Sequence, residues 1–382
     1  MSSPVQAPVF IGARIYRGSS YGDRHPLAIP RVPTVIDLCR ALGWLPQACY
    51  RSSPRAKPEA LTAFHTPTYV AALQRAEDTQ SVSPQIRLRH GLGTLSNPVY
   101  PEMFRRPATS VGGVLFGSAL IAEGGVAYVP GGGTHHGLAD RASGFCYFND
   151  PVLAILALRR QGLDRIAYVD IDAHHCDGVE TALSGHDGVR LISVHEEARW
   201  PFTGALENTA GGVAFNLPVP RGLNDTEYQM ILEQFILPAV QSYRPQAIVL
   251  QCGADAVLED PLSRLALSNT CHWSTVSALR PMAPRLLVLG GGGYNPWSVG
   301  RLWTGVWATL CGHEIPDRLP AAAQSVLTAL NWHRRAGRPP LAHWTTTLRD
   351  APRPGPIRPE LRSRIKRLRG RLLTETGAVT VN

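Results

Sequence analysis

Long apolar runs, a secretory leader and patterned cysteines are all missing from this sequence of 382 residues. No apolar run approaches the roughly 18 residues that a membrane-spanning helix needs, which argues against a transmembrane protein. The N-terminal stretch MSSPVQAPVF lacks the charged and then apolar order of a signal peptide. The seven cysteines are scattered, odd in number and without a C-x-x-C pair, which argues against a disulfide framework and a zinc ribbon. We therefore expect a cytoplasmic protein in a reducing compartment.

Positive charge is concentrated near the C-terminus. The formal net charge is +9, but eight basic residues and one glutamate lie between Arg353 and Arg371, so that only about +2 remains elsewhere. From about Gly337 the sequence is rich in proline and arginine, and there is no internal repeat. We predict a single main domain over residues 1–336 and a basic extension over residues 337–382. The extension is typical of a solvated terminal helix, and its charge would also suit an anionic partner such as nucleic acid.

Short apolar runs alternate with stretches of helical periodicity along the main domain. Strands are expected at residues 9–15, after Gly125, and at residues 166–169, 191–195, 247–251 and 286–289. This alternation predicts an α/β fold in three layers, with a parallel sheet and helices on both of its faces. In such folds, ligands bind at the carboxyl ends of the strands.

One stretch, IAYVDIDAHHCDGVE at residues 166–180, carries the densest chemistry. Its apolar beginning reads as a buried parallel strand. The strand then ends in five ionisable residues, Asp170, Asp172, His174, His175 and Asp177. Residues two apart on an extended chain point the same way, so Asp172 and His174 can face one point, where a carboxylate and an imidazole would suit zinc or iron. The alternative is a polar turn whose side chains cap the next helix.

Three further expected strands end in polar side chains, namely His135 with His136, Asp255, and Tyr294. Because parallel strands end at one edge of a sheet, we expect these groups to share a cleft. A catalytic zinc site has three protein ligands and an open position, and Asp255 is the best third candidate, although alone it could cap a helix. His135 and His136 could bind metal themselves. If they do not, they are free for proton transfer, with Asp170 and Asp177 left to fix their tautomers.

Four motifs then occur in a specific order: GGGTHHG…SGFCYFND, YVDIDAHHCDGVE, QCGADA…DP and GGGGYN. Over roughly residues 20–315 the sequence resembles the zinc-dependent histone deacetylase family, which includes bacterial acetoin-utilisation and acetylpolyamine members. The resemblance implies the arginase–deacetylase α/β fold and makes residues 1–336 a catalytic domain. It also implies an amide hydrolase that removes acyl groups from lysine-like amines.

The resemblance assigns roles to individual positions. It implies zinc ligands at Asp172, His174 and Asp255, with ferrous iron as the alternative metal in the cell. It implies an acid/base pair at His135 and His136, backed by Asp170 and Asp177, and a tyrosine that polarises the substrate carbonyl at Tyr294. A structural potassium ion would use Asp170, Asp172, His174, Ser193 and Val194. The wall of a substrate tunnel would include Gly144, Phe145 and Trp200, and Arg31 would line an internal cavity that receives acetate.

Two rim positions depart from patterns within that family. Ser96 stands where lysine deacetylases hold the substrate backbone with an aspartate, and Leu262 stands where polyamine-selective relatives have a gating glutamate. We therefore rank protein or peptide acyl-lysine first as substrate and a small acylated amine second. Phe145 and Trp200 could otherwise be ordinary core aromatics. A binding module without catalysis and a manganese ureohydrolase are the alternatives from other classes, the first disfavoured by the complete set of ligands and the second by too few carboxylates.

Overall fold

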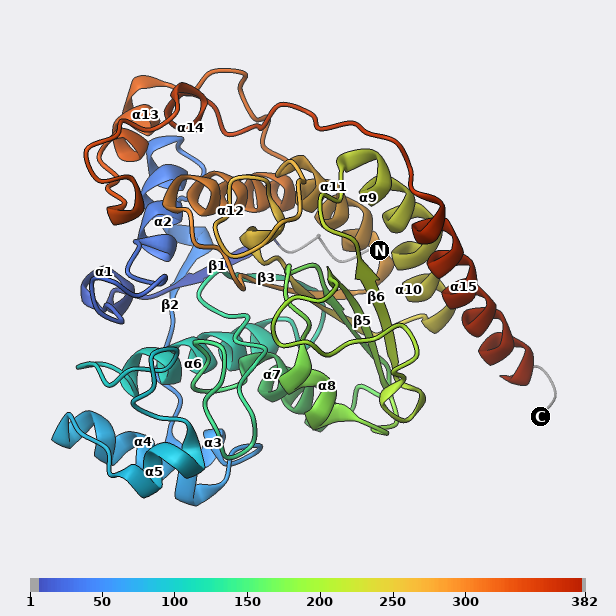
Figure 1. The fold of residues 1–382 in the computed structure, drawn as a ribbon, viewed down its shortest axis with the longest axis horizontal. Helices are drawn as coiled ribbons and strands as arrows, with labels where there is room; N and C mark the ends of the chain where they lie inside the picture. The colour runs from blue at the N-terminus through green and yellow to red at the C-terminus, as the bar shows by residue number, and fades with distance from the viewer. Residues whose placement is uncertain (1–6, 380–382) are drawn as a thin grey trace.

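A single parallel sheet is the centre of the fold (Figure 1). The computed structural model describes residues 7–379. Within these residues, eight strands lie in the order β2-β1-β3-β8-β7-β4-β5-β6, and every neighbouring pair is parallel. The strands are β1 (Val9–Gly12), β2 (Tyr50–Ser52), β3 (Gly125–Val129), β4 (Ile166–Asp170), β5 (Val189–Glu196), β6 (Ala214–Val219), β7 (Ala247–Gln251) and β8 (Arg285–Leu289).

Helices connect the strands and cover the sheet. The α-helices are α1 (Ile15–Gly18), α2 (Arg31–Ala41), α3 (Pro58–Leu61), α4 (Pro67–Thr79), α5 (Pro84–His90), α6 (Arg105–Leu120), α7 (Asp150–Arg160), α8 (Asp177–Leu183), α9 (Asp225–Ile231), α10 (Leu237–Tyr243), α11 (Thr270–Leu279), α12 (Pro296–Cys311), α13 (Ala321–Thr328), α14 (Ala342–Thr346) and α15 (Pro359–Val379). A π-helical turn, η3 (Leu232–Ile236), joins α9 to α10, and short 3₁₀ turns are η1 (Gln47–Cys49), η2 (Ala210–Gly212), η4 (Ala254–Ala256), η5 (Arg280–Met282) and η6 (His333–Arg335).

The helices divide into two layers, one on each face of the sheet. Helices α2, α9, α10, α11 and α12 lie on one face, and α6, α7 and α8 lie on the other (Figure 1). Strand β4 shows why both layers form, since its residues alternate between two apolar cores. Ala167 and Val169 belong to the core under the first layer, and Ile166 and Tyr168 to the core under the second. The predicted three-layer α/β fold is confirmed.

The helices that follow strands β3 and β8 begin at side-chain caps. Asn149 accepts a hydrogen bond from the Val152 backbone N–H, 3.1 Å away, at the start of α7. Asn295 does the same for Trp297 and Ser298 at the start of α12. These caps satisfy backbone donors that a helix leaves unpaired, and they fix the loops that precede each helix.

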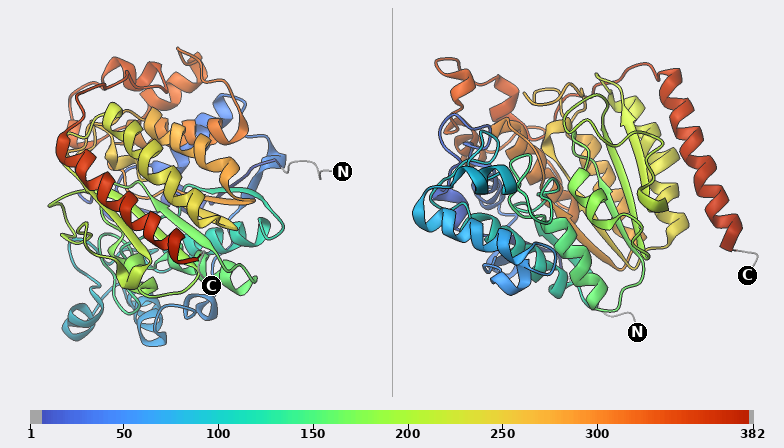
Figure 2. Two further views of the ribbon diagram at one scale, coloured as in Figure 1. Left: turned by 90° about the vertical axis from the view of Figure 1, so that its right-hand side faces the viewer. Right: turned by 60° about the horizontal axis from the view of Figure 1, so that its bottom comes forward.

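The C-terminal segment packs onto the body of the protein. Arg301 of α12 is fully buried and pairs with Asp350 at 2.6 Å, which ties the segment to the core. Helix α15 crosses α10 and β6 (Figure 2), and its inner stripe is buried at Leu361, Ile365, Leu368 and Leu372. The division into a catalytic domain over residues 1–336 and an extension over residues 337–382 stays a prediction.

The helices and the cysteines can be compared with what the sequence led us to expect. None of the helices in residues 7–379 is both long and apolar enough to cross a bilayer. All seven cysteines are free thiols.

Candidate active site

The polar groups at the strand ends gather because the order of the sheet places β3, β8, β7 and β4 side by side. Each of these four strands has parallel neighbours, so all four end at the same edge. The side chains that follow them are less than one-tenth exposed: His135 and His136 after β3, Tyr294 after β8, Asp255 after β7, and Asp172 and His174 after β4. The sequence-predicted cleft therefore corresponds to four adjacent strands.

Asp172, His174 and Asp255 form a group that could hold a metal ion. One ligand atom from each residue lies within 4.8 Å of the others. The His174 Nδ1 lies 2.9 Å from Asp255 Oδ2 and 3.3 Å from Asp172 Oδ1. Backbone N–H groups hold both carboxylates in place: Gly292 donates to Asp172 Oδ2 at 2.6 Å, and Ala173 donates to Asp255 Oδ1 at 2.9 Å.

The chemistry of this group fits a divalent cation. Two carboxylates are buried together, and within the described residues neither forms an ion pair with lysine or arginine. Burial and the nearby charge of Asp172 raise the pKa of Asp255, so the pair is under electrostatic strain that a dication would relieve. Two carboxylate oxygens and one imidazole nitrogen are a known zinc donor set.

Glycine at position 292 is needed for this arrangement. A Cβ atom there would collide with the Asp255 carboxylate and crowd Asp172. The glycine-rich stretch after β8 therefore brings backbone amide groups up to the carboxylates where any other residue would displace them.

The tandem histidines each have their own carboxylate. His135 Nδ1 lies 2.7 Å from Asp170 Oδ2, and His136 Nδ1 lies 2.6 Å from Asp177 Oδ1. The two imidazole rings are 4.0 Å apart, and His135 Nε2 lies 3.9 Å from Asp172 Oδ1. A carboxylate on Nδ1 keeps the proton there, so the Nε2 atom of each ring is the one left for other chemistry.

The two histidines differ in their acid–base character. Burial disfavours the charged form of His135, but the carboxylates of Asp170 and Asp172 outweigh burial and raise the pKa of His135 to about 9. Burial and the neighbouring charge of His135 lower the pKa of His136 to about 4, despite its bond to Asp177. The two imidazoles therefore differ in the direction of their pKa shifts, which suits two different roles.

Aromatic rings flank the metal-ligand group. Trp200 packs edge-to-face on His136, with 4.6 Å between ring centroids, and Phe145 packs edge-to-face on Tyr294 at 5.7 Å. Gly144 has φ +52°, and a Cβ there would collide with both Trp200 and His136. The absence of a side chain at Gly144 therefore keeps Trp200 close to the histidines.

Tyr294 and Leu262 are joined through a residue that the sequence analysis did not single out. The two oxygens of buried Asp260 accept hydrogen bonds from the backbone N–H of Tyr294, at 2.7 Å, and of Leu262, at 2.8 Å. Leu262 packs with Phe145 and Tyr294 in one apolar cluster. Burial raises the pKa of Tyr294 well above its ordinary value, so its hydroxyl stays protonated and can donate a hydrogen bond.

Ser96 is exposed, whereas Ser193 and Val194, the two candidate cation residues outside the groups above, are buried on β5. The exposed Ser96 is connected to the site through its carbonyl, which lies 3.2 Å from His25 Nε2, and His25 packs on Phe145 at 4.6 Å. Ser193 pairs with Asp170 across β5 and β4, but its hydroxyl contacts His195 Nδ1 at 2.9 Å. Val194 is buried beside it.

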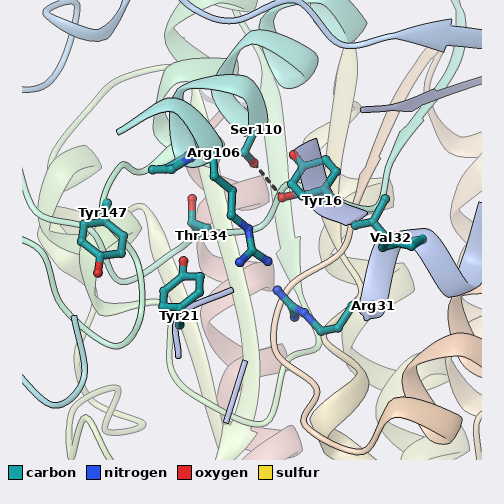
Figure 3. A pocket seen from close by; sticks show the side chains of 11 residues that line it. Tyr16, Tyr21, Arg31, Val32, Arg106, Ser110, Thr134 and Tyr147 are labelled. Carbon is teal, nitrogen blue, oxygen red and sulfur yellow. Dashed lines mark hydrogen bonds between the residues drawn. The ribbon is translucent and has the colours of Figure 1, made fainter. Parts of the chain in front are cut away.

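Arg31 lines a small internal cavity of about 30 Å³ (Figure 3). Its guanidinium and that of Arg106 both point into this space, together with the hydroxyl groups of Tyr16 and Tyr21 (Figure 3). Arg31 donates to the carbonyl of Gly291 at 2.6 Å, and Gly291 lies against Asp172. Gly291 therefore separates the cavity from the metal-ligand group. The Nε atom of Arg31 is buried without a partner. Two guanidinium groups and free donors suit a small carboxylate.

Sequence reasoning missed Tyr168, Asp260 and Arg106. Tyr168 donates to Asp170 at 2.6 Å and lies two residues before it, so strand alternation could have found it. Asp260 stands in the DP end of a quoted motif, which was a usable signal. Arg106 had none, because it lies at the start of a helix far along the chain from Arg31.

Comparisons with known proteins agree with this geometry. A family model described as the histone deacetylase domain matches residues 25–310. Histone deacetylase 9 of Arabidopsis thaliana is 34% identical over 79% of this chain and 73% of its own length, and histone deacetylase 1 of Homo sapiens is 33% identical over 78% and 64%. Histone deacetylase 1 of Oryza sativa is 35% identical, and the match spans only 59% of its length. Crystal structures of an HDAC homologue from Aquifex aeolicus and of an HDAC homologue complexed with SAHA each match with a TM-score of 0.90 and 34% identity, over 95% of this chain and all of theirs.

Proposed function

The chain belongs to the histone deacetylase family and has the arginase–deacetylase fold, and we propose that it removes acetyl groups from lysine side chains of proteins or peptides. Members of the family are zinc-dependent hydrolases of acetyl-lysine amide bonds, and this chain is an enzyme of that class. The substrate, the residue roles and the acyl group preferred are parts of the proposal.

One observation carries the proposal more than any other. The buried group of Asp172, His174 and Asp255 lies beside two histidines whose Nδ1 atoms are both held by carboxylates. A metal-binding group next to two oriented imidazoles is what hydrolysis of an unactivated amide requires, because the reaction needs a nucleophilic water, an acid for the leaving amine and a group that stabilises the oxyanion.

Asp172, His174 and Asp255 would hold zinc. When bound, zinc lowers the pKa of water and polarises an amide carbonyl. Tyr294 would donate a hydrogen bond from its protonated hydroxyl to the developing oxyanion, and Asp260 would hold the Tyr294 backbone in position. Ferrous iron as the metal in the cell and potassium near Asp170, Asp172, His174, Ser193 and Val194 are finer proposals that rest on the resemblance.

We assign the proton transfers to the neutral imidazole. His136 would accept a proton from the attacking water at Nε2 and return it to the leaving amine, and Asp177 would hold its Nδ1–H throughout. His135, kept charged by Asp170, would stabilise negative charge in the transition state. The difference in pKa between the two rings supports this division.

The aromatic rings beside the metal-ligand group support an acyl-lysine substrate. A thin aliphatic stem would pass between Phe145 and Trp200, with the amide beyond them. Released acetate would bind the Arg31 cavity, where Arg106 provides a second guanidinium. A small acylated amine is the second candidate, because Ser96 offers no carboxylate to a peptide backbone.

Nucleic-acid binding through the basic C-terminal extension is a separate proposal. Arg358, Arg364 and Arg367 form ion pairs with carboxylates of the body, so part of the positive charge of the extension is already neutralised by the protein itself. Arg362, Lys366 and Arg369 are exposed on α15. DNA affinity that falls steeply with salt and disappears on deletion of residues 352–382 would support it, and absent or flat binding would end it.

The test of the main proposal is a substrate panel on purified enzyme. Acetyl-, propionyl- and longer acyl-lysine peptides are compared with acetylated polyamines, for the wild type beside Tyr294→Phe and His136→Ala. We expect peptide turnover that falls by about 10²-fold or more in both variants while each retains its zinc. Acetylated polyamines turning over far better than every peptide would put the second candidate first.

A further inference from the structure

The loop that joins β7 to α11 carries residues that support the site. Asp255, a proposed metal ligand, lies near its start, and Asp260 accepts the Tyr294 backbone N–H at 2.7 Å. Glu259, the residue before Asp260, accepts a hydrogen bond through its carbonyl from the Asn295 side chain at 3.3 Å. The loop therefore holds Tyr294 and the residue after it at two separate points.

The side chain of Glu259 is held by the C-terminal segment. Its Oε1 lies 2.7 Å from Arg353 Nη2 and 3.6 Å from His343 Nε2. The Glu259 carboxylate is only 13% exposed, so the ion pair is screened less than a pair in open solvent. Among the residues that the structure describes, Glu259 Oε2 is buried without a hydrogen-bond partner. Arg353 is therefore the closest compensation for the burial of this carboxylate.

The backbone of Arg353 is fixed independently of the ion pair. Its N–H donates to Asp225 Oδ2 at 2.8 Å, and its carbonyl accepts the Asp225 N–H at 3.0 Å. Three residues earlier, Asp350 and Asn269 exchange two hydrogen bonds, each of 3.0 Å, between the side chain of one and the backbone N–H of the other. Arg353 therefore reaches Glu259 from an anchored position.

We propose that Arg353 is a positioning residue for Tyr294, acting through Glu259 and Asp260. The inference rests on the proposed function, in which the Tyr294 hydroxyl donates a hydrogen bond to the oxyanion. A buried carboxylate that loses its partner is costly, so without the guanidinium Glu259 would turn toward water and the loop backbone would shift with it. The bonds from the loop to Tyr294 and Asn295 would pass this shift to the hydroxyl.

A small shift is enough to matter. A group that stabilises a transition state must be held within about 0.5 Å of its productive position. Arg353 lies in the stretch that the sequence predicts to be a basic extension beyond the catalytic domain. The structure thus gives part of that stretch a role in catalysis.

The experiment compares wild type with Arg353→Met, Arg353→Lys and Glu259→Ala on an acetyl-lysine peptide. We expect Arg353→Met and Glu259→Ala to lower kcat by about five- to twentyfold, with KM within about twofold and a full zinc content. The loss falls on kcat because the hydroxyl acts on charge that forms only in the transition state. Arg353→Lys keeps the charge and should restore kcat to within about threefold of wild type.

Arg358→Met is the matched control. Arg358 pairs with the buried Glu227 of α9 and ties the same segment to the body without contacting the loop between β7 and α11 through that pair. Its loss should lower the melting temperature at least as much as Arg353→Met does, because Glu227 is left buried and unpaired. We expect its kcat to stay within about twofold of wild type.

A second arm places Arg353→Met in the Tyr294→Phe protein. If Arg353 acts through the hydroxyl, its replacement should lower kcat there by less than about twofold, because two residues that serve one interaction are not additive. A residue that only stabilises the fold would give the same fall in both backgrounds.

The outcomes separate this inference from the proposed function. Unchanged kcat in Arg353→Met, or an equal fall in the Tyr294→Phe background, would overturn the positioning role and leave the deacetylase assignment intact. A fall in kcat for Arg358→Met as large as for Arg353→Met would also overturn it, because any loosening of the segment would then suffice. Should Arg353→Met fail to fold, Glu259→Ala takes its place in both arms. If wild type turned over no acetyl-lysine substrate with zinc bound, the proposed function itself would fail.

Discussion

Replacement of Asp170 by asparagine tests how the site orients His135. Asp170 is fully buried and accepts three hydrogen bonds: from His135 Nδ1 at 2.7 Å, from the Tyr168 hydroxyl at 2.6 Å and from the Asp172 backbone N–H at 3.0 Å. The first two reach Oδ2 and the third reaches Oδ1. Asparagine has the same shape but only one acceptor oxygen, so one of these two sides must face an NH₂ group.

Either orientation of the amide is costly. If NH₂ faces His135, Nδ1 must accept a hydrogen bond instead of donating one. The ring then has its only proton on Nε2 and is neutral, so both its tautomer and its charge are changed. If NH₂ faces the Asp172 N–H, two buried donors oppose each other at a cost of about 1–3 kcal/mol. We expect kcat/KM to fall by about 10- to 100-fold, or about 1.4–2.7 kcal/mol, as for other residues that orient groups around a metal.

The assay measures kcat, KM and zinc content on one preparation of each protein. Zinc content should stay near that of wild type, because Asp172, His174 and Asp255 are unchanged, and the loss should fall on kcat. Asp164→Asn is the matched control, since the Asp164 side chain is 82% exposed. An Asp170→Asn enzyme within twofold of wild type, with full zinc, would refute the reasoning that Asp170 fixes the state of His135.

Three further outcomes are expected from the structure. Burial lowers the pKa of His65 from 6.5 to about 4, and its Nε2 accepts the Asn149 N–H at 3.0 Å. Between pH 6.5 and about 4 the unfolded chain binds a proton at this residue and the folded chain does not, so the free energy of unfolding decreases as the pH is lowered. In urea titrations, the decrease in the free energy of unfolding from pH 7 to pH 5 should be about 2 kcal/mol smaller in His65→Gln than in wild type, and equal decreases would contradict this. Leu368→Ala should lower the free energy of unfolding by about 2–4 kcal/mol because Leu368 is buried under α15, whereas exposed Arg369→Ala should change it by less than about 0.5 kcal/mol; similar values for both would show that α15 does not contribute a packed face. Gly292→Ala should weaken zinc binding by about tenfold or more in a chelator competition, and unchanged affinity would show that the loop can yield.

The sheet could be predicted largely because its central strands are buried on both faces. Strand β4 is an apolar run that ends in Asp170, and β7 is an apolar run followed four residues later by Asp255; this contrast marks both the element and the position of the site. Edge strands lack the signal. Strand β6 contains Pro218 and β2 is a short, exposed strand, and neither was predicted from the sequence. Proline is tolerated at such an edge because one side of the strand makes no ladder.

The candidate site was predictable where residues follow one strand and harder where distant segments meet. Spacing alone places Asp172 and His174 together, since alternation on an extended chain is a local property. Spacing does not pair His135 with Asp170 or bring Arg106 to Arg31, because those contacts depend on how strands β3, β4 and helix α6 are ordered in space.

The basic C-terminal segment spends part of its charge on the body of the protein. The same arginines that predict an anion-binding extension form ion pairs with Glu227, Glu197 and Glu207 across the surface of the body. Their alternation with Leu361, Ile365 and Leu368 makes α15 amphipathic, with one face buried. An apolar stripe within a charged segment is the sequence signal that favours packing over solvation.

The central claim is that Asp172, His174 and Asp255 hold one zinc ion on which amide hydrolysis depends. Its most direct test is zinc per chain, measured by mass spectrometry beside acetyl-lysine turnover, in wild type and in Asp255→Asn. We predict one zinc per wild-type chain, and a variant that stays folded but loses most of its zinc and its turnover together. An Asp255→Asn protein that keeps a full zinc ion and wild-type turnover would contradict it.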